Sequence, residues 1–200
     1  MSGQSRALVI GGSVGGLFAA HMLRSIGWEV VVFERSGDDL VRRGAGIGAN
    51  DALFSVMRRI GVPFDVSNAI ALPSRVWLET NGNIAAEVPT SGAFATTWAL
   101  VYQALKDALC AECCCFDRNL VRVEERADDV TAIFADGSSA SGSLLIAADG
   151  ILFHFQSRRS PEETAASAYR EPACMINASI KGSGASGRAL RPLPLATQGG

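Results

Sequence analysis

The chain has 200 residues, which is enough for one domain with a sizeable core. Hydrophobic residues make up 48% of it and charged residues 19%, a balance that excludes an intrinsically disordered chain or a fibrous repeat. The formal net charge is −2 and no basic stripe is present, so we expect no nucleic-acid partner. We find neither a signal peptide nor an apolar run of membrane-spanning length, and expect no membrane contact. The odd number of cysteines, five, favours reduced thiols and a cytoplasmic protein.

A strand, a helix and a second strand are predicted at the start of the chain. The apolar run Ala7–Ile10 ends at a glycine, which is typical of a buried parallel strand. Apolar residues recur at helical spacing from Val14 to Ser25, and Gly27 marks the expected end of that helix. Val30–Phe33 is a second buried strand. Such a βαβ unit predicts an α/β fold with a Rossmann-like parallel sheet.

The turn after the first strand, Gly11-Gly-Ser-Val-Gly-Gly16, has the position of a dinucleotide-binding fingerprint but departs from its usual spacing. Gly11 permits a tight turn, and Gly16 lets the helix pack closely on the strand. Ser13 replaces the middle glycine and is small enough for a pyrophosphate to approach backbone N–H groups at the positive end of the helix. The candidate cofactor-binding residues of this turn are Gly11, Gly12, Ser13, Val14 and Gly16.

Glu34 ends the second strand 23 residues after Gly11, where a carboxylate can accept hydrogen bonds from both ribose hydroxyls of an adenine dinucleotide. An acid at this place argues against a 2′-phosphate. Arg35 is a candidate to stack on adenine or to pair with phosphate, and otherwise a solvated surface charge. Together these features favour a bound dinucleotide over a glycine-rich turn that only packs a helix on a sheet.

A glycine-rich loop and a second helix are expected next. The loop covers Arg43–Gly48. The helix runs from Asn50, its expected N-cap, to Arg59, with Gly61 as a stop. Its inward-facing residues are predicted to be Leu53, Val56, Met57 and Ile60.

A hairpin and a third helix follow. Arg75–Glu79 and Ile84–Val88 flank Asn81-Gly82, which predicts an antiparallel hairpin. Apolar residues then recur at helical spacing and are interpreted as core rather than as a cofactor contact; they are Trp98, Val101, Tyr102, Leu105 and Leu109.

The last predicted elements are a three-stranded meander and one more buried strand. Leu120–Glu125 and Val130–Phe134 alternate in polarity, and Asp136-Gly137 makes the next turn. The buried strand Leu144–Ile146 leads into Asp149-Gly150. From Leu152 the apolar runs end, so we expect one domain over residues 1–151 and a largely disordered tail over residues 152–200.

Four of the five cysteines crowd together behind the third helix, at Cys110, Cys113, Cys114 and Cys115. Only Cys174, His21 and His154 could complete a metal site, so we predict none and interpret the cluster as reduced thiols at a helix end. His21 is interpreted as an exposed or satisfied helix residue. No catalytic residue is assigned.

These motifs together resemble the class A FAD-dependent flavoprotein monooxygenases, or aromatic hydroxylases, over roughly residues 6–151. Val9–Leu17 and Val30–Arg35 look like the branch that contains 2,6-dihydroxypyridine 3-monooxygenase. Arg43–Ile47 resembles the segment near the FAD ribose and pyrophosphate, which adds Gly46 and Ile47 to the candidate site. Val123 matches a strand position that touches adenine, and Leu144–Gly150 resembles the element whose aspartate, here Asp149, supports flavin binding.

The resemblance implies FAD as cofactor, NADH or NADPH as reductant, and hydroxylation of a small aromatic or N-heteroaromatic substrate by molecular oxygen. Three features depart from the family pattern. Ala147 stands where glycine is usual, and the serine and arginine expected after Asp149-Gly150 are absent. The later Gly-Asp segment, which holds the ribityl chain and the flavin ring, does not appear, so the chain looks like a truncated, N-terminal part of such an enzyme.

A shift of the reading frame after codon 151 is one hypothesis for this break. Read one base later, the codons of Leu152–Gln156 permit Tyr-Ser-Thr-Phe-Arg, which is the continuation that the family shows. In the same frame the codons of Cys174–Ile176 contain a stop, so a single shift does not restore a full-length protein.

Three functions remain open from the sequence. The first is an FAD-dependent, NAD(P)H-using monooxygenase of which this chain is an N-terminal fragment. The second, which we favour for the polypeptide alone, is a non-catalytic FAD-binding fragment or pseudogene product. The third is a small NAD-dependent reductase, for which residues 11–34 would suffice, although Asp149-Gly150 argues against it.

Overall fold

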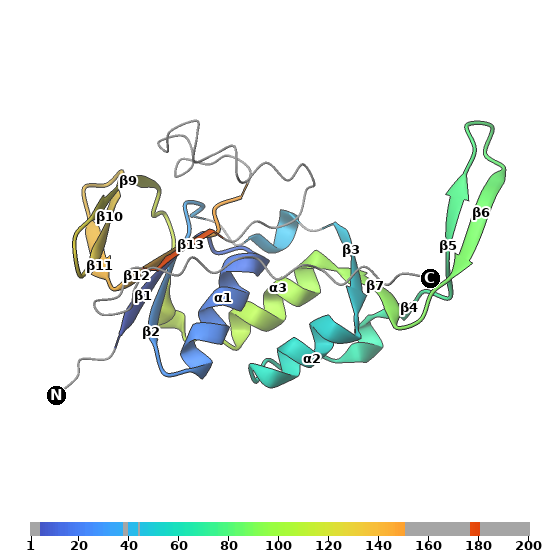
Figure 1. Cartoon of the computed structure of the whole chain (residues 1–200), viewed down its shortest axis with the longest axis horizontal. Coiled ribbons are helices and arrows are strands. Elements are labelled where there is room, and N and C mark those ends of the chain that lie inside the picture. The colour runs from blue at the N-terminus through green and yellow to red at the C-terminus, as the bar shows by residue number, and fades with distance from the viewer. Residues whose placement is uncertain (1–4, 38–39, 44, 151–176, 181–200) are drawn as a thin grey trace.

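The computed structural model describes residues 5–37, 40–43, 45–150 and 177–180. A five-stranded sheet forms the centre of its main body, with the strand order β13-β12-β1-β2-β8 (Figure 1). The strands of this sheet are β1 (Arg6–Ile10), β2 (Glu29–Phe33), β8 (Cys114–Cys115), β12 (Leu144–Ala147) and β13 (Asn177–Ile180). The first four run parallel and β13 pairs antiparallel to β12, which confirms the predicted Rossmann-like sheet.

Three helices and three smaller sheets complete the described part of the chain. The helices are α1 (Val14–Ser25), α2 (Asp51–Arg59) and α3 (Trp98–Asp107), with short 3-10 helices at Leu40–Arg43, Val66–Asn68 and Ala111–Cys113. The predicted meander is formed by β9 (Leu120–Glu125), β10 (Val130–Phe134) and β11 (Ser139–Gly142). The remaining strands are β3 (Gly46–Asn50), β4 (Ile70–Ala71) and β7 (Ala93–Thr97) in one antiparallel sheet, and β5 (Ser74–Leu78) and β6 (Ile84–Pro89) in a hairpin.

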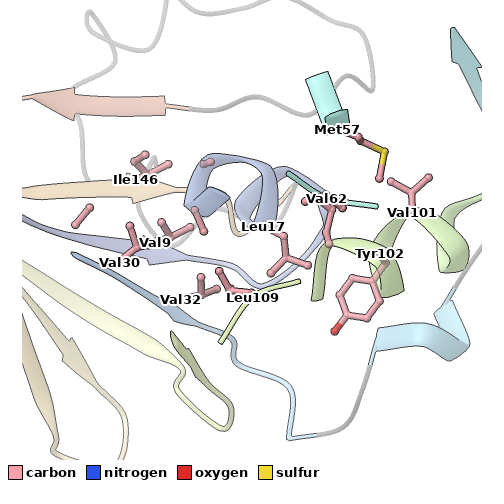
Figure 2. Packing of buried hydrophobic residues seen from close by; sticks show 14 of the residues in the cluster. Val9, Leu17, Val30, Val32, Met57, Val62, Val101, Tyr102, Leu109 and Ile146 are labelled. Carbon is pink, nitrogen blue, oxygen red and sulfur yellow. The ribbon is translucent and has the colours of Figure 1, made fainter. Parts of the chain in front are cut away.

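The two faces of the parallel sheet are covered by different layers, because side chains alternate between the faces along each strand. Ala7 and Val9 of β1 belong to a buried cluster with residues of α1 and α3, and Figure 2 shows Val9, Leu17 and Tyr102 among its members. Leu8 and Ile10 belong to a second cluster, formed with the meander. Tyr102 of α3 lies in the first cluster and is 1% exposed, so the apolar stripe of this helix is core, as predicted.

The predicted ends of α1 and α2 are confirmed by their backbone geometry. Gly27 and Gly61 follow the two helices with φ values of +89° and +74°, which glycine adopts without steric cost. Asn50 caps α2, because its side-chain oxygen accepts the N–H of Leu53 at 3.0 Å.

The predicted loop over Arg43–Gly48 is wrong at its C-terminal half, where Gly46–Asn50 forms β3. This strand pairs with β7, so that Gly46 stands opposite Thr97 and Gly48 opposite Ala95. Glycine is unfavourable in strands because it contributes no side-chain packing. The neighbouring strand supplies the backbone bonds that hold β3, and a residue pattern within 43–48 does not reveal them.

The inward face of α2 is only partly as predicted. Met57 is buried as expected, but the other fully buried residue is Phe54, whereas Leu53, Val56 and Ile60 are half-buried. The Phe54 ring stacks on Phe64 and meets Phe94 edge-on, with centroid distances of 5.6 and 5.3 Å. Contact with Phe94 of β7 therefore buries Phe54 in place of Leu53, one residue along the helix from the predicted face.

The predicted hairpin β5–β6 is confirmed, and it extends away from the main body (Figure 1). The N–H of Glu79 donates to the carbonyl of Asn83 at 2.7 Å and closes the turn around Gly82, whose φ is +88°. Several large apolar residues of the hairpin lie in water, including Trp77 at 50% and Leu78 at 66% exposure. A hairpin this exposed contributes little to the core of the described residues.

The segment from Leu152 lies outside the described residues apart from β13, which adds a strand to the edge at β12. Asn177 pairs with Ala147 and Ile180 with Leu144. No strand was expected at this place. An edge strand such as β12 offers unpaired backbone groups, so pairing there needs no apolar pattern in the added segment.

The packing of α1 on β1 depends on the absence of a side chain at Gly16. A Cβ atom built on Gly16 would lie 1.9 Å from the carbonyl oxygen of Gly11 and 3.3 Å from Val9. The helix can therefore approach the strand only while residue 16 is glycine.

Replacing Phe54 by alanine should lower the free energy of unfolding by about 3–5 kcal/mol, because it leaves a cavity between Phe64 and Phe94. Ser55→Ala, at an exposed position of the same helix, should change it by less than about 0.5 kcal/mol. Urea denaturation followed by circular dichroism measures both. Equal effects of the two substitutions would contradict the burial of Phe54.

Gly16→Ala should destabilise the chain by about 1–3 kcal/mol or more, because the new methyl group meets a backbone carbonyl that cannot move independently. Gly48→Ala is the matched control, since a Cβ there meets nothing within 4 Å. Thermal unfolding of the two variants should show a lower midpoint for Gly16→Ala only. A normal midpoint for Gly16→Ala would show that the helix does not approach the strand this closely.

Candidate functional site

The turn after β1 lies where three parallel strands end. The N–H of Gly11 donates to the carbonyl of Phe33 at the end of β2, at 2.8 Å. On the other side, the N–H of Ala148 donates to the carbonyl of Ile10 at 2.7 Å. Because β1 lies between β2 and β12, the direction of winding reverses there, and ligands of open α/β sheets bind outside the strand ends at such a point.

Gly11 adopts a backbone conformation that an L side chain rarely takes, with φ of +106°. A Cβ atom at Gly11 would lie 2.3 Å from the carbonyl oxygen of Ala148 and 2.9 Å from the N atom of Asp149. The turn is therefore packed directly against the Ala148-Asp149 backbone. This contact brings the predicted site residues Gly11 and Asp149 together, although they are far apart in sequence.

The N-terminus of α1 opens at the same turn with backbone donors available. The first bond within the helix runs from the N–H of Leu17 to the carbonyl of Ser13 at 2.9 Å, and the N–H groups of the preceding helical turn have no acceptor within the helix. The Ser13 side chain forms no capping bond, and the first turn contains no acidic residue. The end of the helix is therefore suited to an anion.

Glu34 lies beside this turn, and its carboxylate is held by two backbone groups. Its Oε2 accepts the N–H of Gly12 at 2.7 Å, and its Oε1 accepts the N–H of Ser36 at 2.9 Å. The residue is 8% exposed. A carboxylate has about four acceptor positions, so each oxygen can still accept a hydroxyl proton. The predicted role of Glu34 toward a ribose is compatible with this geometry.

The other predicted site residues are spread more widely. Arg35 is exposed next to Glu34, and Val14 begins α1 with its side chain against the first core cluster. Gly46 and Ile47 lie in β3, in a different sheet from β1, and Ile47 packs against the first cluster as well. Val123 in β9 packs against the second cluster, which contains Phe33. Their roles toward a cofactor stay predictions.

His21 is satisfied within the fold, as interpreted from the sequence. The residue is buried, and its Nε2 donates to the carbonyl of Leu105 in α3 at 2.8 Å. His154 lies outside the described residues.

Cys110 and Cys113 differ from the expectation of reduced thiols, because they are joined by a disulfide. Their Cys-x-x-Cys spacing is a sequence signal that the interpretation as incidental thiols overlooked. Within the described ranges, no three His, Cys, Asp or Glu side chains gather in a way that could hold a metal ion. No helix in the described part of the chain is long and apolar enough to cross a membrane.

The residues present fit the ADP half of FAD. Glycines at the turn let the backbone lie close to a ligand, the helix end offers N–H donors to a pyrophosphate, and Glu34 offers acceptors to a ribose. The N–H donors of the helix end and the carboxylate acceptors of Glu34 lie side by side at the carboxyl ends of the parallel strands. Such an arrangement can hold a diphosphate next to a ribose through backbone N–H groups.

The chain is similar to known monooxygenases in sequence and in fold. The chain is 30% identical over 168 residues to 6-hydroxynicotinate 3-monooxygenase of Pseudomonas fluorescens, covering 76% of this chain and 42% of that enzyme. The structure of 2,6-dihydroxypyridine-3-hydroxylase from Arthrobacter nicotinovorans matches with a TM-score of 0.65 at 31% identity, over 74% of this chain and 37% of the other. Klebsiella pneumoniae HpxO, complexed with FAD and uric acid, matches with a TM-score of 0.63 at 29% identity, over 75% and 40%.

The chain thus spans about two fifths of the length of these relatives. The model of the FAD binding domain family matches residues 4–160, which is more than half of the sequence. This match confirms the predicted FAD cofactor and the predicted resemblance to FAD-dependent monooxygenases. The chain belongs to the FAD binding domain family.

Proposed function

We propose that this chain is the FAD-binding part of a monooxygenase that uses NADH or NADPH and molecular oxygen to hydroxylate a small N-heteroaromatic or aromatic substrate. The observation that carries the proposal is that the turn at Gly11 contacts both Glu34 and the backbone of Asp149, at the carboxyl ends of the parallel strands. The substrate class rests on the relatives, which include monooxygenases of 6-hydroxynicotinate and 2,6-dihydroxypyridine. We assign the cofactor-binding unit to residues 1–151 and the reaction to the cytoplasm.

Each proposed contact follows from the chemistry of the residue at that place. The N–H groups at the start of α1, from Ser13 and Val14 onward, would hold the pyrophosphate, and Glu34 would accept the ribose hydroxyls. Arg35 is exposed beside Glu34 and would stack on the adenine or pair with a phosphate. Asp149 would orient the part of the cofactor that extends past Gly11.

Bound FAD would supply the redox chemistry and the activation of oxygen, while the protein positions the cofactor and excludes water. In the described part of the chain, the assembled contacts serve the ADP half. We therefore propose that this polypeptide alone binds FAD without catalysing hydroxylation. The hairpin leaves several large apolar side chains exposed, including Trp77 and Leu78. This supports the proposal, because exposed apolar surface often marks a place where another part of a protein packs.

Binding of cofactor fragments tests the proposal directly. Isothermal titration of the purified 200-residue chain should give similar dissociation constants for ADP and FAD and no binding of FMN, because the contacts lie on the ADP half. NADH oxidation with 6-hydroxynicotinate or 2,6-dihydroxypyridine should remain at the background rate. Absence of ADP binding would refute the cofactor site, and substrate-stimulated NADH oxidation would refute the non-catalytic reading. Tight binding of NADH with no binding of FAD would favour the small reductase instead.

Glu34→Gln should weaken ADP binding roughly 10- to 100-fold, because hydrogen bonds to a charged acceptor contribute about 1.5–3 kcal/mol. Glu29→Gln is the matched control on the same strand, since Glu29 is exposed and pairs only with Arg6 at 3.2 Å in the described contacts. Its ADP affinity should equal that of the unaltered chain. Urea denaturation of both variants separates loss of binding from loss of fold. Unchanged affinity in a folded Glu34→Gln chain would remove Glu34 from the site.

A further inference from the structure

Cys110 and Cys113 form a disulfide in the turn between α3 and β8. Their Cα atoms are 5.3 Å apart, within the range that a disulfide spans, and both residues are half-buried. The site is separate from the residues proposed to bind FAD. A Cys-x-x-Cys pair at a partly exposed turn is the usual setting of a reactive dithiol.

A cation faces both sulfur atoms of this pair. The Nη1 of Arg24, in the last turn of α1, lies 2.6 Å from the Sγ of Cys110 and 2.6 Å from the Sγ of Cys113. Arg24 is 86 and 89 residues away from them in sequence, so the fold brings this charge to the pair. A guanidinium at this distance stabilises a thiolate, which is the nucleophilic form of cysteine.

A purely structural role explains the pair poorly. The disulfide joins residues only three positions apart, and short loops restrict the unfolded chain least. Both flanking elements are already fixed without it. Leu105 and Leu109 are buried in the first core cluster on one side, and β8 is paired with β2 on the other.

The two neighbouring cysteines, Cys114 and Cys115, are free thiols. Cys113 and Cys114 both pack against the first core cluster, and Cys115 packs against the second. Burial, and secondarily the adjacent Cys115, raises the pKa of the Cys114 thiol, so this residue stays protonated at neutral pH. The four clustered cysteines thus divide into a disulfide-bonded pair beside Arg24 and two free thiols.

We propose that Cys110 and Cys113 are a reversible dithiol–disulfide site that exchanges with low-molecular-weight disulfides of the glutathione class. One thiolate of the reduced pair attacks a sulfur of the small disulfide, forming a mixed disulfide and releasing one small thiolate. The second cysteine then attacks the protein sulfur of the mixed disulfide and releases the second small thiolate. The two protons lost by the cysteines end on the two released thiols, and the pair is oxidised by two electrons as the small disulfide is reduced.

Differential alkylation of the whole chain, equilibrated with different ratios of glutathione to its disulfide, tests the site. Trypsin cuts after Lys106 and Arg118 and leaves all four clustered cysteines in one peptide, residues 107–118. Free thiols receive a light label before reduction, and cysteines released by reduction receive a heavy one. In the oxidised range Cys110 and Cys113 should carry heavy labels and Cys114 and Cys115 light ones, and all four should become light in the reduced range. A pair that stays oxidised, or stays reduced, at every ratio would overturn the proposal, as would a different pairing.

Substitution of Arg24 tests the reactivity of the reduced cysteines, separately from whether Cys110 and Cys113 form a disulfide. Arg24→Gln should slow the reaction of the reduced chain with glutathione disulfide roughly 3- to 10-fold at neutral pH, because the thiolate loses its cation. Arg58→Gln is the matched control, since Arg58 is an exposed arginine in the last turn of α2. Equal rates for the two variants would overturn the role of Arg24. Both substitutions are at the surface, and circular dichroism verifies that each variant is folded.

Discussion

The close contact of α1 with the turn after β1 is the constraint on which the rest of the structure depends. The Gly11 carbonyl lies where a side chain at Gly16 would be, and Gly11 itself is packed against the Ala148 backbone. One small turn therefore fixes the distance from helix to strand and the distance from β1 to the end of β12. Because strand ends and helix start are fixed together, the donors of the helix face the same crevice that the strand ends border.

The site holds a carboxylate close to the place proposed for a negative pyrophosphate, and backbone N–H groups bind that carboxylate. The Gly12 N–H donates to Glu34, whereas the N–H groups at the start of α1 begin at Val14, two residues further along the chain. The backbone N–H of Gly12 thus binds the carboxylate of Glu34, and the N–H groups at the start of α1 are left for the pyrophosphate of the proposed ligand. The side chain of Glu34 is held by Gly12 and Ser36 and needs no ligand to be in position.

The sequence predicted the elements that build the site better than those around it. Val9 and Glu34 lie in a unit whose apolar runs, glycines and acid all indicate the same structure, so local pattern and tertiary packing agree there. At Gly48 the pattern indicated a loop, but pairing with β7 made a strand. For α2 the helix itself was predicted correctly, but its buried face was not. Phe54 is buried because it contacts Phe64 and Phe94, and both of these residues lie outside the helix whose periodicity was analysed.

The cysteine-rich segment shows how closely two chemically different sites can lie in this fold. The N–H of Glu34 donates to the carbonyl of Cys115 at 2.9 Å, and the N–H of Arg118 donates to the carbonyl of Glu34 at 2.9 Å. The segment that begins with the Cys110–Cys113 pair therefore holds the backbone of Glu34, while Gly12 and Ser36 hold its carboxylate. The bond from the Gly12 N–H to the Glu34 carboxylate involves no residue of the cysteine-rich segment, so it holds the carboxylate independently of the Cys110–Cys113 pair.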